Sequence, residues 1–354
     1  MMMIQSDLTS QEQTVTRKKV ILITGANGEV GHGLIKQLYK DPSAPPVITL
    51  DIRGLDEDIM PYVDSSIVGD ILDNDLLDNL TSEYEIDTIF HLAALLSTHS
   101  EYRPEAAHRV NVQGTVNLLH LAVEQARCRD HPVKFIYPSS VAVYGMPDLE
   151  TKARVGAVRE NDFLEPITMY GCNKLYCEHL GRYYTFHYRQ LAPKAQESGV
   201  DFRGVRFPGL ISATTMPSGG TSDYAPEMLH AAAKGEPYES FVRPDTIMPF
   251  MAMPDAIKAL LTLADAPRDQ LTRSVYNVTS FSLTAEQIAE RVKTFFPNAQ
   301  ISYEPTHGRQ KIVDSWPAAI DDSTARADWG WQPDYDVEQA FADYLVPTIK
   351  QQYT

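Results

Sequence analysis

The sequence predicts an α/β protein, with a doubly wound parallel sheet and a smaller C-terminal α/β lobe. Three observations lead to this prediction. Short apolar runs rich in β-branched residues recur through the first two-thirds of the chain, amphipathic segments separate them, and prolines and glycines crowd the chain after residue 212. Strands that alternate with helices form parallel sheets covered by helices on both faces. Apolar runs without polar alternation indicate strands buried on both sides.

Each element of the sheet domain is expected from its own segment. Six strands are predicted, at VILIT (20–24), VITLDI (47–52), SIVGDI (66–71), TIFHLA (88–93), VKFIYPS (133–139) and FRGVRFPGLI (202–211). Helices are expected between them, most clearly at EVGHGLIKQLYK (29–40) and VNVQGTVNLLHLAVEQA (110–126). In the second segment Val112, Val116, Leu119 and Val123 fall on one helical face, which predicts that this face packs against the sheet.

The chain is divided into three predicted regions. Residues 1–17 are polar and are expected to form a flexible tail, 18–212 a cofactor-binding sheet domain, and 213–354 mainly a smaller substrate-binding lobe. Helical patterns return at 255–264 and 284–296, and some return of the chain to the sheet domain is expected. The lobe is predicted to cover the carboxyl ends of the strands, where open α/β sheets bind ligands.

The composition excludes several classes of partner. Lysine and arginine number 31 against 47 acidic residues, a net charge of −16, which would repel a nucleic-acid backbone or an anionic membrane surface. No apolar run approaches the ~18–20 residues that span a bilayer. The cysteines, Cys128, Cys172 and Cys177, match neither a disulfide framework nor a zinc site, so no metal is expected. Free thiols suit a reducing compartment, so the cytoplasm is predicted, with the mitochondrial matrix as the alternative.

A glycine-rich loop predicts the cofactor. Gly25, Gly28 and Gly31 lie between a predicted buried strand and an amphipathic helix. Glycines there let the backbone approach a pyrophosphate, which is then held at the helix N-terminus in a Rossmann-type fold. The alternative, a glycine-rich turn without a ligand, is less consistent with this setting. Asp51 ends the next strand, where an acid binds the ribose hydroxyls of NAD and repels the phosphate of NADP, although Arg53 could counter that repulsion.

A second strand end and a helix predict an acid–base pair. Tyr170 and Lys174 are four residues apart, so both fall on one helical face. An ammonium beside the phenol, together with an oxidised nicotinamide, would lower the pKa of the tyrosine and let it act as a base. Ser139 and Ser140 end a strand 30 residues upstream, and a hydroxyl there could hold a substrate oxygen. Asp70 could bind the adenine amino group or merely cap a turn.

These motifs, in this order, resemble the extended short-chain dehydrogenase/reductase family, in its epimerase-like branch. The resemblance covers residues 18–345 and implies a catalytic triad of Ser140, Tyr170 and Lys174. It also implies that FHLAAL passes along the cofactor, that Asn111 matches an asparagine of the following helix, and that the protein is a homodimer. His91 is interpreted as a core histidine. The predicted cofactor contacts are Gly25, Asn27, Gly28, Glu29, Val30, Gly31, Asp51, Ile52, Arg53, Asp70, Ile71, Leu92, Ala93, Ala94, Tyr170, Lys174 and Leu210.

Segments of both lobes are similar to one group within that family, the short-chain type of L-threonine 3-dehydrogenase. They are EIDTIFHLAALLS, RFPGLIS, GGTSDYA, PDTIMPFMAMPDA and DSWP with DDSTARADWGW. The similarity implies oxidation of the β-hydroxyl of threonine by NAD. The predicted substrate contacts are Ser97, Ser140, Tyr170, Gly220, Thr221, Ser222 and Trp316, with Asp223 as a further candidate. The loop at 218–224 could act as a lid, or it could be an ordinary surface turn.

The chain departs from the group's pattern in three places. Segment 185–202 carries about ten extra residues, which would lengthen a surface loop. Ser218 and Ser222 replace a more usual glycine and threonine, and Ala252 stands where an aromatic residue is commoner. These last changes are expected at the substrate pocket.

Two alternatives to a dehydrogenase stay open. A nucleotide-sugar epimerase or dehydratase would share the fold, the triad and NAD. The dehydratase form usually has Asp-Glu after the triad serine, whereas Val141 and Ala142 follow here. A non-catalytic NAD-sensing protein is disfavoured by the complete triad, and a zinc-dependent dehydrogenase by the lack of a Cys/His ligand set.

Overall fold

We analysed a computed structural model of the whole chain, which describes residues 17–129, 131–192, 198–215 and 219–353. The predicted N-terminal tail lies outside the described residues except for Arg17, whose guanidinium donates to the carbonyl of Thr81.

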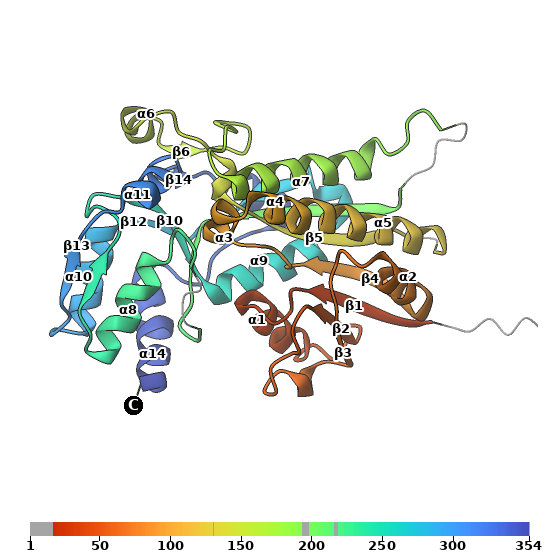
Figure 1. Cartoon of the computed structure of the whole chain (residues 1–354), viewed down its shortest axis with the longest axis horizontal. Helices are drawn as coiled ribbons and strands as arrows, with labels where there is room; N and C mark the ends of the chain where they lie inside the picture. The colour runs from red at the N-terminus through yellow and green to blue at the C-terminus, as the bar shows by residue number, and fades with distance from the viewer. Residues whose placement is uncertain (1–16, 130, 193–197, 216–218, 354) are drawn as a thin grey trace, which may run out of the picture.

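A seven-stranded, wholly parallel sheet forms the centre of the larger lobe (Figure 1). Its strand order is β11-β7-β5-β4-β1-β2-β3, so the chain starts in the middle and winds outward in both directions. The doubly wound α/β prediction is therefore confirmed. The strands are β1 (Lys18–Thr24), β2 (Val47–Asp51), β3 (Ser65–Val68), β4 (Tyr84–His91), β5 (Val133–Ser140), β7 (Val200–Phe207) and β11 (Val275–Asn277).

Helices cover both faces of this sheet. One face carries α1 (Glu29–Leu38) and α9 (Met253–Asp265), which pack against each other and share one hydrophobic core. The other face carries α2 (Asn74–Glu83), α5 (Gly114–Arg127) and α7 (Met169–Phe186), with a second core beneath them. In Figure 1, α5 and α7 lie on the opposite side of the sheet from α1. A π-helical segment, η2 (His108–Gln113), leads directly into α5.

The last predicted strand, 202–211, is two strands in the structure. The prediction of one element was wrong because Pro208, which has no N–H to donate, separates them. β7 ends at Phe207 in the large sheet, and β8 (Gly209–Ile211) pairs instead with β10 (Ile247–Ala252) of a smaller sheet. This break carries the chain from one lobe to the other next to the site described below.

Two other differences concern the sheet edges. The segment predicted as a strand at 66–71 is strand only to Val68, and the chain then turns at Ile71 and Leu72 toward α2. The seventh strand, β11, was not predicted because three residues are too short to show a pattern. It brings a distant segment back to the large sheet beside β7.

The smaller lobe is built from residues 141–168 and most of those after 209. Its sheet has the order β12-β10-β8, and two further pairs, β13-β9 and β14-β6, flank it. The strands new here are β6 (Ala157–Val158), β9 (Tyr238–Ser240), β12 (Phe281–Thr284), β13 (Ile301–Tyr303) and β14 (Ala319–Ile320). Its helices are α6 (Leu149–Arg154), α8 (Tyr224–Lys234), α10 (Ala285–Phe295), α11 (His307–Asp314), α13 (Val337–Gln339) and α14 (Val346–Tyr353).

The remaining elements are short or lie between the lobes. They are α3 (Ser97–Tyr102), α4 (Pro104–Ala107), α12 (Ser323–Trp329), which packs on β11, η1 (Met60–Tyr62), η3 (Val141–Val143), η4 (Arg268–Gln270) and η5 (Ala340–Leu345). Of the predicted extra segment at 185–202, residues 187–192 and 198–199 contain neither helix nor strand, and 193–197 lie outside the described residues.

Candidate active site

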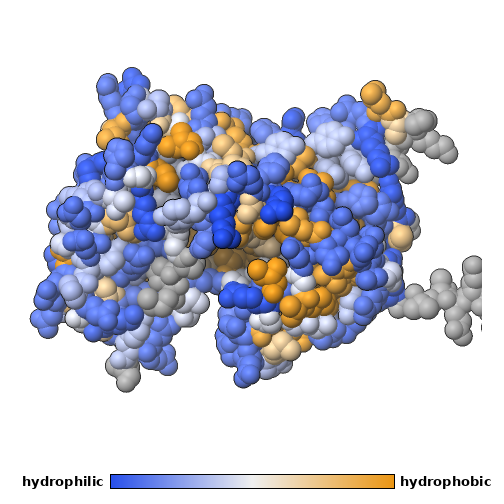
Figure 2. Space-filling model, viewed as in Figure 1, coloured by the Kyte–Doolittle hydropathy of each residue, from blue (hydrophilic) through white to orange (hydrophobic). Residues whose placement is uncertain are grey.

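A cavity of about 590 Å³ lies where the carboxyl ends of the large sheet's strands face the smaller lobe. Figure 2 shows the hollow between the lobes, with hydrophobic residues gathered along the side of the larger lobe. Every predicted site residue except Asn27 lines this cavity. They are Gly25, Gly28, Glu29, Val30, Gly31, Asp51, Ile52, Arg53, Asp70, Ile71, Leu92, Ala93, Ala94, Ser97, Ser140, Tyr170, Lys174, Leu210, Gly220, Thr221, Ser222 and Trp316.

The glycine loop is shaped to bring main chain, not side chains, to the cavity. Gly25 has φ +66°, and a Cβ there would lie 2.5 Å from the backbone nitrogen of Ala93. A Cβ on Gly31 would lie 2.2 Å from the carbonyl oxygen of Ala26. Gly28 is different: it caps α1, and an added Cβ would meet only the oxygen of Gly25, at 3.5 Å. The cavity side of Gly28 is therefore open, which fits the close approach of a dinucleotide pyrophosphate to the N-terminus of α1.

Asp51 is held at the end of β2 by main-chain donors. Its Oδ2 accepts from the backbone N–H of Asn27 at 3.0 Å, and its Oδ1 accepts from that of Arg53 at 3.1 Å. The Asn27 side chain bonds away from the cavity, to the carbonyl of Gly54 and the N–H of Asp56. Asn27 therefore ties two loops together, and it is the one predicted cofactor contact that does not line the cavity. Both carboxylate oxygens of Asp51 keep a free acceptor site for ribose hydroxyls.

Asp70 lies in the turn that follows β3. Its Oδ1 accepts from the backbone N–H of Leu72 at 3.0 Å, which is the turn-capping arrangement. The same residue lines the cavity beside Ile71, and its contact with the adenine amino group stays a prediction.

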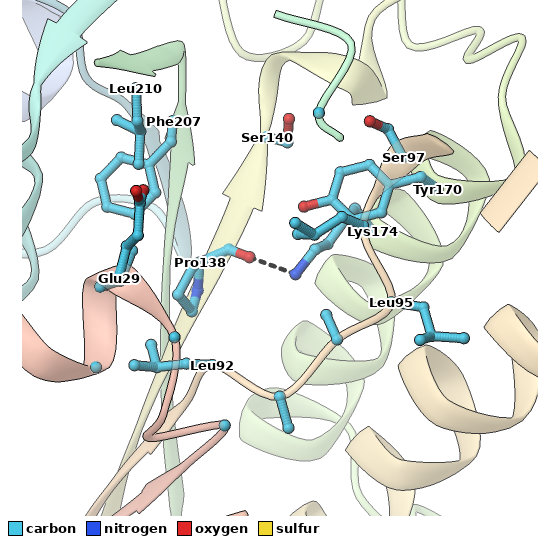
Figure 3. A pocket seen from close by; sticks show the side chains of 18 of the residues that line it. Glu29, Leu92, Leu95, Ser97, Pro138, Ser140, Tyr170, Lys174, Phe207 and Leu210 are labelled. Atoms are coloured by element: carbon cyan, nitrogen blue, oxygen red, sulfur yellow. Dashed lines mark hydrogen bonds between the residues drawn. The ribbon is translucent and has the colours of Figure 1, made fainter. Parts of the chain in front are cut away.

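The three predicted catalytic residues meet at the other end of the cavity. Tyr170 is the second residue of α7, whose start is capped by Thr168, and Lys174 follows one turn later. In Figure 3 the phenol of Tyr170 points into the space between Lys174 and Ser140, which ends β5. The Lys174 ammonium lies 5.5 Å from the centre of the Tyr170 ring and donates to the carbonyl of Pro138 at 2.6 Å (Figure 3).

Burial shifts the pKa values of both members of this pair in the protein chain. It raises the pKa of the Tyr170 phenol well above its usual value, because the charged phenolate is desolvated. Burial lowers the pKa of Lys174 to about 8, while the thiol of Cys177 and the carboxylate of Glu178 raise it. The expected lowering of the phenol pKa requires the positive charge of oxidised nicotinamide as well as the ammonium, so it stays a prediction for the NAD-bound protein.

The two neighbouring serines have separate partners. Ser139 is buried, and its hydroxyl donates to Glu178 at 2.5 Å, behind the cavity. The Ser140 oxygen accepts from the backbone N–H of Ala142 at 3.1 Å, and its hydroxyl hydrogen stays available to a substrate oxygen. Both serines line the cavity, but the Ser139 hydrogen is used by Glu178, so Ser140 stays the predicted donor to a substrate oxygen.

Two buried polar residues shape the loop after β4. Asn111, in η2, accepts from the N–H of Leu95 at 2.8 Å and donates to its carbonyl at 3.1 Å. His91 is bonded by the hydroxyls of Thr24 and Thr115, at 2.8 and 2.9 Å, and burial lowers its pKa to about 3. The interpretation of His91 as a satisfied core histidine is confirmed.

The end of the cavity that is predicted to bind the substrate, here called the substrate half, is made of side chains from distant segments. Thr221 donates from its hydroxyl and its backbone N–H to the Ser97 oxygen, at 3.0 and 3.2 Å. Asp223 accepts from the N–H groups of Gly219 and Gly220, at 2.9 and 2.5 Å, and so fixes the turn that presents Thr221. A serine 124 positions away from the threonine thus completes one hydroxyl cluster.

An unpredicted electrostatic feature joins the two halves. Burial, together with the charge of Asp223, raises the pKa of Glu29 to about 7, although a hydrogen bond with Ser212 opposes the shift. Burial also raises the pKa of Asp223. The sequence predicted Glu29 as a cofactor contact but gave no sign of this acidic neighbour, since the two residues are far apart in the chain.

Sequence reasoning missed part of the cavity wall where the chain crosses between the lobes. This part includes Phe207 and Met253 of the larger lobe and Ser212, Pro226 and Met248 of the smaller lobe. The segments RFPGLIS and PDTIMPFMAMPDA could have indicated this wall, because they lie on either side of the crossing between the lobes.

Ala252 was expected at the pocket, and this was wrong. It is buried in the smaller lobe's hydrophobic core, and its neighbour Met253 lines the cavity instead. Ser218, the other departure from the group's pattern, lies outside the described residues.

Two features are absent from the part of the chain that the structure describes. Among residues 17–129, 131–192, 198–215 and 219–353, no group of three or more His, Cys, Asp or Glu side chains could hold a metal ion. Over the same residues, no helix is both long and apolar enough to cross a membrane.

Comparison with known proteins agrees with this geometry. The model of the NAD dependent epimerase/dehydratase family matches residues 21–279. The mitochondrial L-threonine 3-dehydrogenase of Bos taurus is 35% identical over 328 residues, covering 92% of this chain and 81% of that protein.

Two solved structures are also similar. A partial consensus L-threonine 3-dehydrogenase superposes with a TM-score of 0.83 at 36% identity, covering 94% of this chain and 99% of that one. A monomeric L-threonine 3-dehydrogenase from a metagenome database superposes with a TM-score of 0.82 at 34% sequence identity. The match covers 94% of this chain and 100% of that one.

Proposed function

The chain belongs to the NAD dependent epimerase/dehydratase family, and we propose that it oxidises the β-hydroxyl of L-threonine with NAD, giving 2-amino-3-ketobutyrate. One observation carries the proposal: the phenol of Tyr170, the ammonium of Lys174 and the hydroxyl of Ser140 border one cavity with the glycine loop. The names of the similar enzymes point to threonine as the substrate.

The residues of the chain divide the reaction between them. NAD, when bound, supplies the acceptor for the hydride that leaves the β-carbon. Ser140 donates a hydrogen bond to the substrate oxygen and holds it beside the phenol. Tyr170 takes the hydroxyl proton as the C=O bond forms, which requires its phenolate form. The Lys174 ammonium, 5.5 Å from the phenol ring, favours that form electrostatically.

The substrate half suits a small zwitterion. Ser97, Thr221 and Ser222 offer hydroxyl donors for a carboxylate, and Asp223 offers a negative charge for an ammonium. Trp316 and Met248 add apolar wall where a methyl group could pack. Arg53 and Lys174 are the only cations lining the described cavity, and both belong to the cofactor half, so we assign carboxylate binding to hydroxyls.

A spectrophotometric panel tests the proposal. The purified protein is mixed with NAD and, separately, with threonine, serine, other 3-hydroxy amino acids and UDP-sugars, and NADH absorbance is followed. We expect NADH to form with threonine, and we expect this activity to be retained in a chelator. Activity with NADP in place of NAD should be much lower, because Asp51 would repel a 2′-phosphate. Turnover of UDP-sugars without net NADH would instead favour the epimerase alternative.

We also propose that the protein is a homodimer through α5 and α7. On α7, Tyr176, Tyr183 and Phe186 are 51%, 40% and 53% exposed along one side of the helix, and Tyr102 of α3 is 81% exposed. Light scattering should give twice the chain mass, and the double variant Tyr176→Lys/Tyr183→Lys should give the monomer. A wild-type mass of one chain would reject the dimer and would agree with the similar metagenome enzyme, which is named as monomeric.

For the compartment we propose the cytoplasm, because Cys128, Cys172 and Cys177 are free thiols, which suit a reducing compartment. The name of the bovine relative raises the mitochondrial matrix as the alternative. Fractionation of cells carrying the full chain with a C-terminal tag separates the two.

A further inference from the structure

A buried ion pair lies directly behind the proposed catalytic residues. The guanidinium of Arg206, on β7, binds the carboxylate of Glu178, on α7, through two hydrogen bonds of 2.9 and 2.6 Å. The side chains are only 4% and 5% exposed. Neither residue belongs to the predicted triad, and neither lines the cavity.

The pair is joined to the residues that do line it. Glu178 lies one helical turn after Lys174 and accepts from the hydroxyl of Ser139, which directly precedes Ser140. Arg206 directly precedes Phe207 of the cavity wall, and its backbone is in register with Ser139. One carboxylate thus connects α7 to the ends of both β5 and β7.

The other donors of Arg206 extend the connection to the smaller lobe. Its Nη1 donates to the hydroxyl of Tyr144 at 2.9 Å and to the carbonyl of Glu160 at 2.6 Å. The Tyr144 hydroxyl donates to Asn277 at 2.7 Å, and the Asn277 amide donates to the carbonyls of Val158 and Asp321. The network therefore reaches β11 and the β6-β14 pair.

Stability alone is a weak explanation for this pair. Taking two charges out of water costs about as much as their attraction returns, so well-packed apolar residues would stabilise the fold at least as well. The position of the pair is more informative. A misplacement of about 1 Å between reacting groups can lower a rate ~100-fold.

We propose that Glu178 and Arg206 are positioning residues for the reaction: their ion pair fixes the spacing between α7, which carries Tyr170 and Lys174, and the strand end that carries Ser140. The inference rests on the proposed acid–base role of Tyr170. It does not depend on which alcohol is oxidised.

The charge of Glu178 also reaches the ammonium. It raises the pKa of Lys174, against the lowering by burial. The groups facing Glu178 are Ser139 and Tyr137 on β5, Arg206 on β7, Tyr144 after η3, and Lys174 and Cys177 on α7. Those facing Lys174 are Tyr137 and the Pro138 carbonyl on β5, His91 on β4, and Tyr170, Cys177 and Glu178 on α7. Without the carboxylate, the pKa of Lys174 falls further.

The chain supplies a matched control on the same strand. Asp201 and Arg203, near the start of β7, form an equally buried pair with a 2.6 Å contact. Arg203 also donates to the carbonyls of Leu263, Ala264 and Ala266 at the end of α9, and Asp201 also forms an ion pair with Arg268 at 3.2 Å. This pair does not touch the cavity.

The test compares Glu178→Gln with Asp201→Asn in the full-length protein. We expect Glu178→Gln to lower kcat with threonine ~10–100-fold while the Kd for NAD changes less than about three-fold. The basic limb of its kcat–pH profile should move to lower pH. Asp201→Asn should leave kcat and both limbs near wild type, even if it lowers the Tm.

Three outcomes would overturn the proposal. They are an unchanged kcat in Glu178→Gln, an equal loss of kcat in Asp201→Asn, or a rate loss with no movement of the basic limb. If Glu178→Gln does not fold, the double variant Glu178→Gln/Arg206→Met, which leaves no unpaired charge, replaces it and must show the same kcat loss. Absence of threonine activity in the wild type rejects the proposed substrate instead; the same comparison then uses whichever alcohol the panel identifies.

Discussion

The cofactor half of the cavity is made largely of main chain, whereas the substrate half is made of side chains from segments far apart in the sequence. In the cofactor half, glycines bring the backbone of β1 and α1 close to the end of β4, with no room for a Cβ at Gly25 or Gly31. In the substrate half, the hydroxyl of Thr221 meets that of Ser97. The Asp223 carboxylate fixes the turn at Gly219 and Gly220 that presents Thr221. Backbone geometry fixes the first half, and a few hydrogen bonds fix the second.

The largest expected effect comes from Tyr170, the proposed proton acceptor, which lies between the two halves of the cavity. Tyr170→Phe should lower kcat by ~10²–10⁴-fold, because it removes the group that accepts the proton. The Kd for NAD, measured by titration calorimetry, should stay close to wild type. Substantial turnover by this variant would contradict the assigned role.

Two glycine variants in the cofactor half distinguish a glycine that leaves room for the ligand from one that the fold itself requires. Gly28→Ala should weaken NAD binding about 10–100-fold with an unchanged Tm, because its Cβ enters the open side where a pyrophosphate would approach. Gly25→Ala should lower the Tm as well, because its Cβ would overlap the backbone of Ala93 at positive φ. If both variants lower the Tm equally, the cavity side of Gly28 is not open.

A hydroxyl deletion tests the substrate half alone. Thr221→Val should raise the KM for threonine about 5–30-fold, the effect of one lost hydrogen bond in a buried site, and leave the Kd for NAD unchanged. Thr294→Val, which removes a hydroxyl on α10 that bonds only the carbonyl of Glu290, is the control. A change in NAD binding with Thr221→Val would mean that the halves are not independent.

The smallest effect concerns the contact between the halves, where Glu29 faces Asp223. Because the pKa of Glu29 is raised from 4.5 to about 7 in the folded protein, its stabilising contribution is present below pH 4.5 and is lost as the pH rises through 7. Glu29→Gln should therefore raise the Tm by a few degrees at pH 8 and leave it unchanged near pH 4.5. A gain that does not depend on pH would assign the effect to packing.

The sequence predicted much of the cofactor half because its signals are local. A glycine loop between one strand and one helix, and an acid at the end of the next strand, are each readable within about ten residues. Asn27 was the exception: it lies in the loop but turns its side chain toward Gly54 and Asp56. Which way a side chain turns depends on neighbours that the local pattern does not contain.

The remaining errors arose where one residue or one distant contact decided the structure. Pro208 split a predicted strand, because a missing N–H ended the ladder. Ala252 lies in the hydrophobic core of the smaller lobe and not at the pocket. Burial also raises the pKa of Tyr170 in the protein chain, an effect that the spacing of Tyr170 and Lys174 does not contain. Burial is a property of the assembled lobes, so no spacing in the sequence could have revealed it.

By itself, the order of strands, helices and glycines determined that this chain forms a doubly wound sheet with a dinucleotide cradle, since those preferences act between residues near in sequence. Only the tertiary structure decided which serine hydroxyl is used by Glu178, that Thr221 meets Ser97, and that Glu178 and Arg206 join α7 to the strand ends. These outcomes depend on direction and burial, which arise when distant segments pack together.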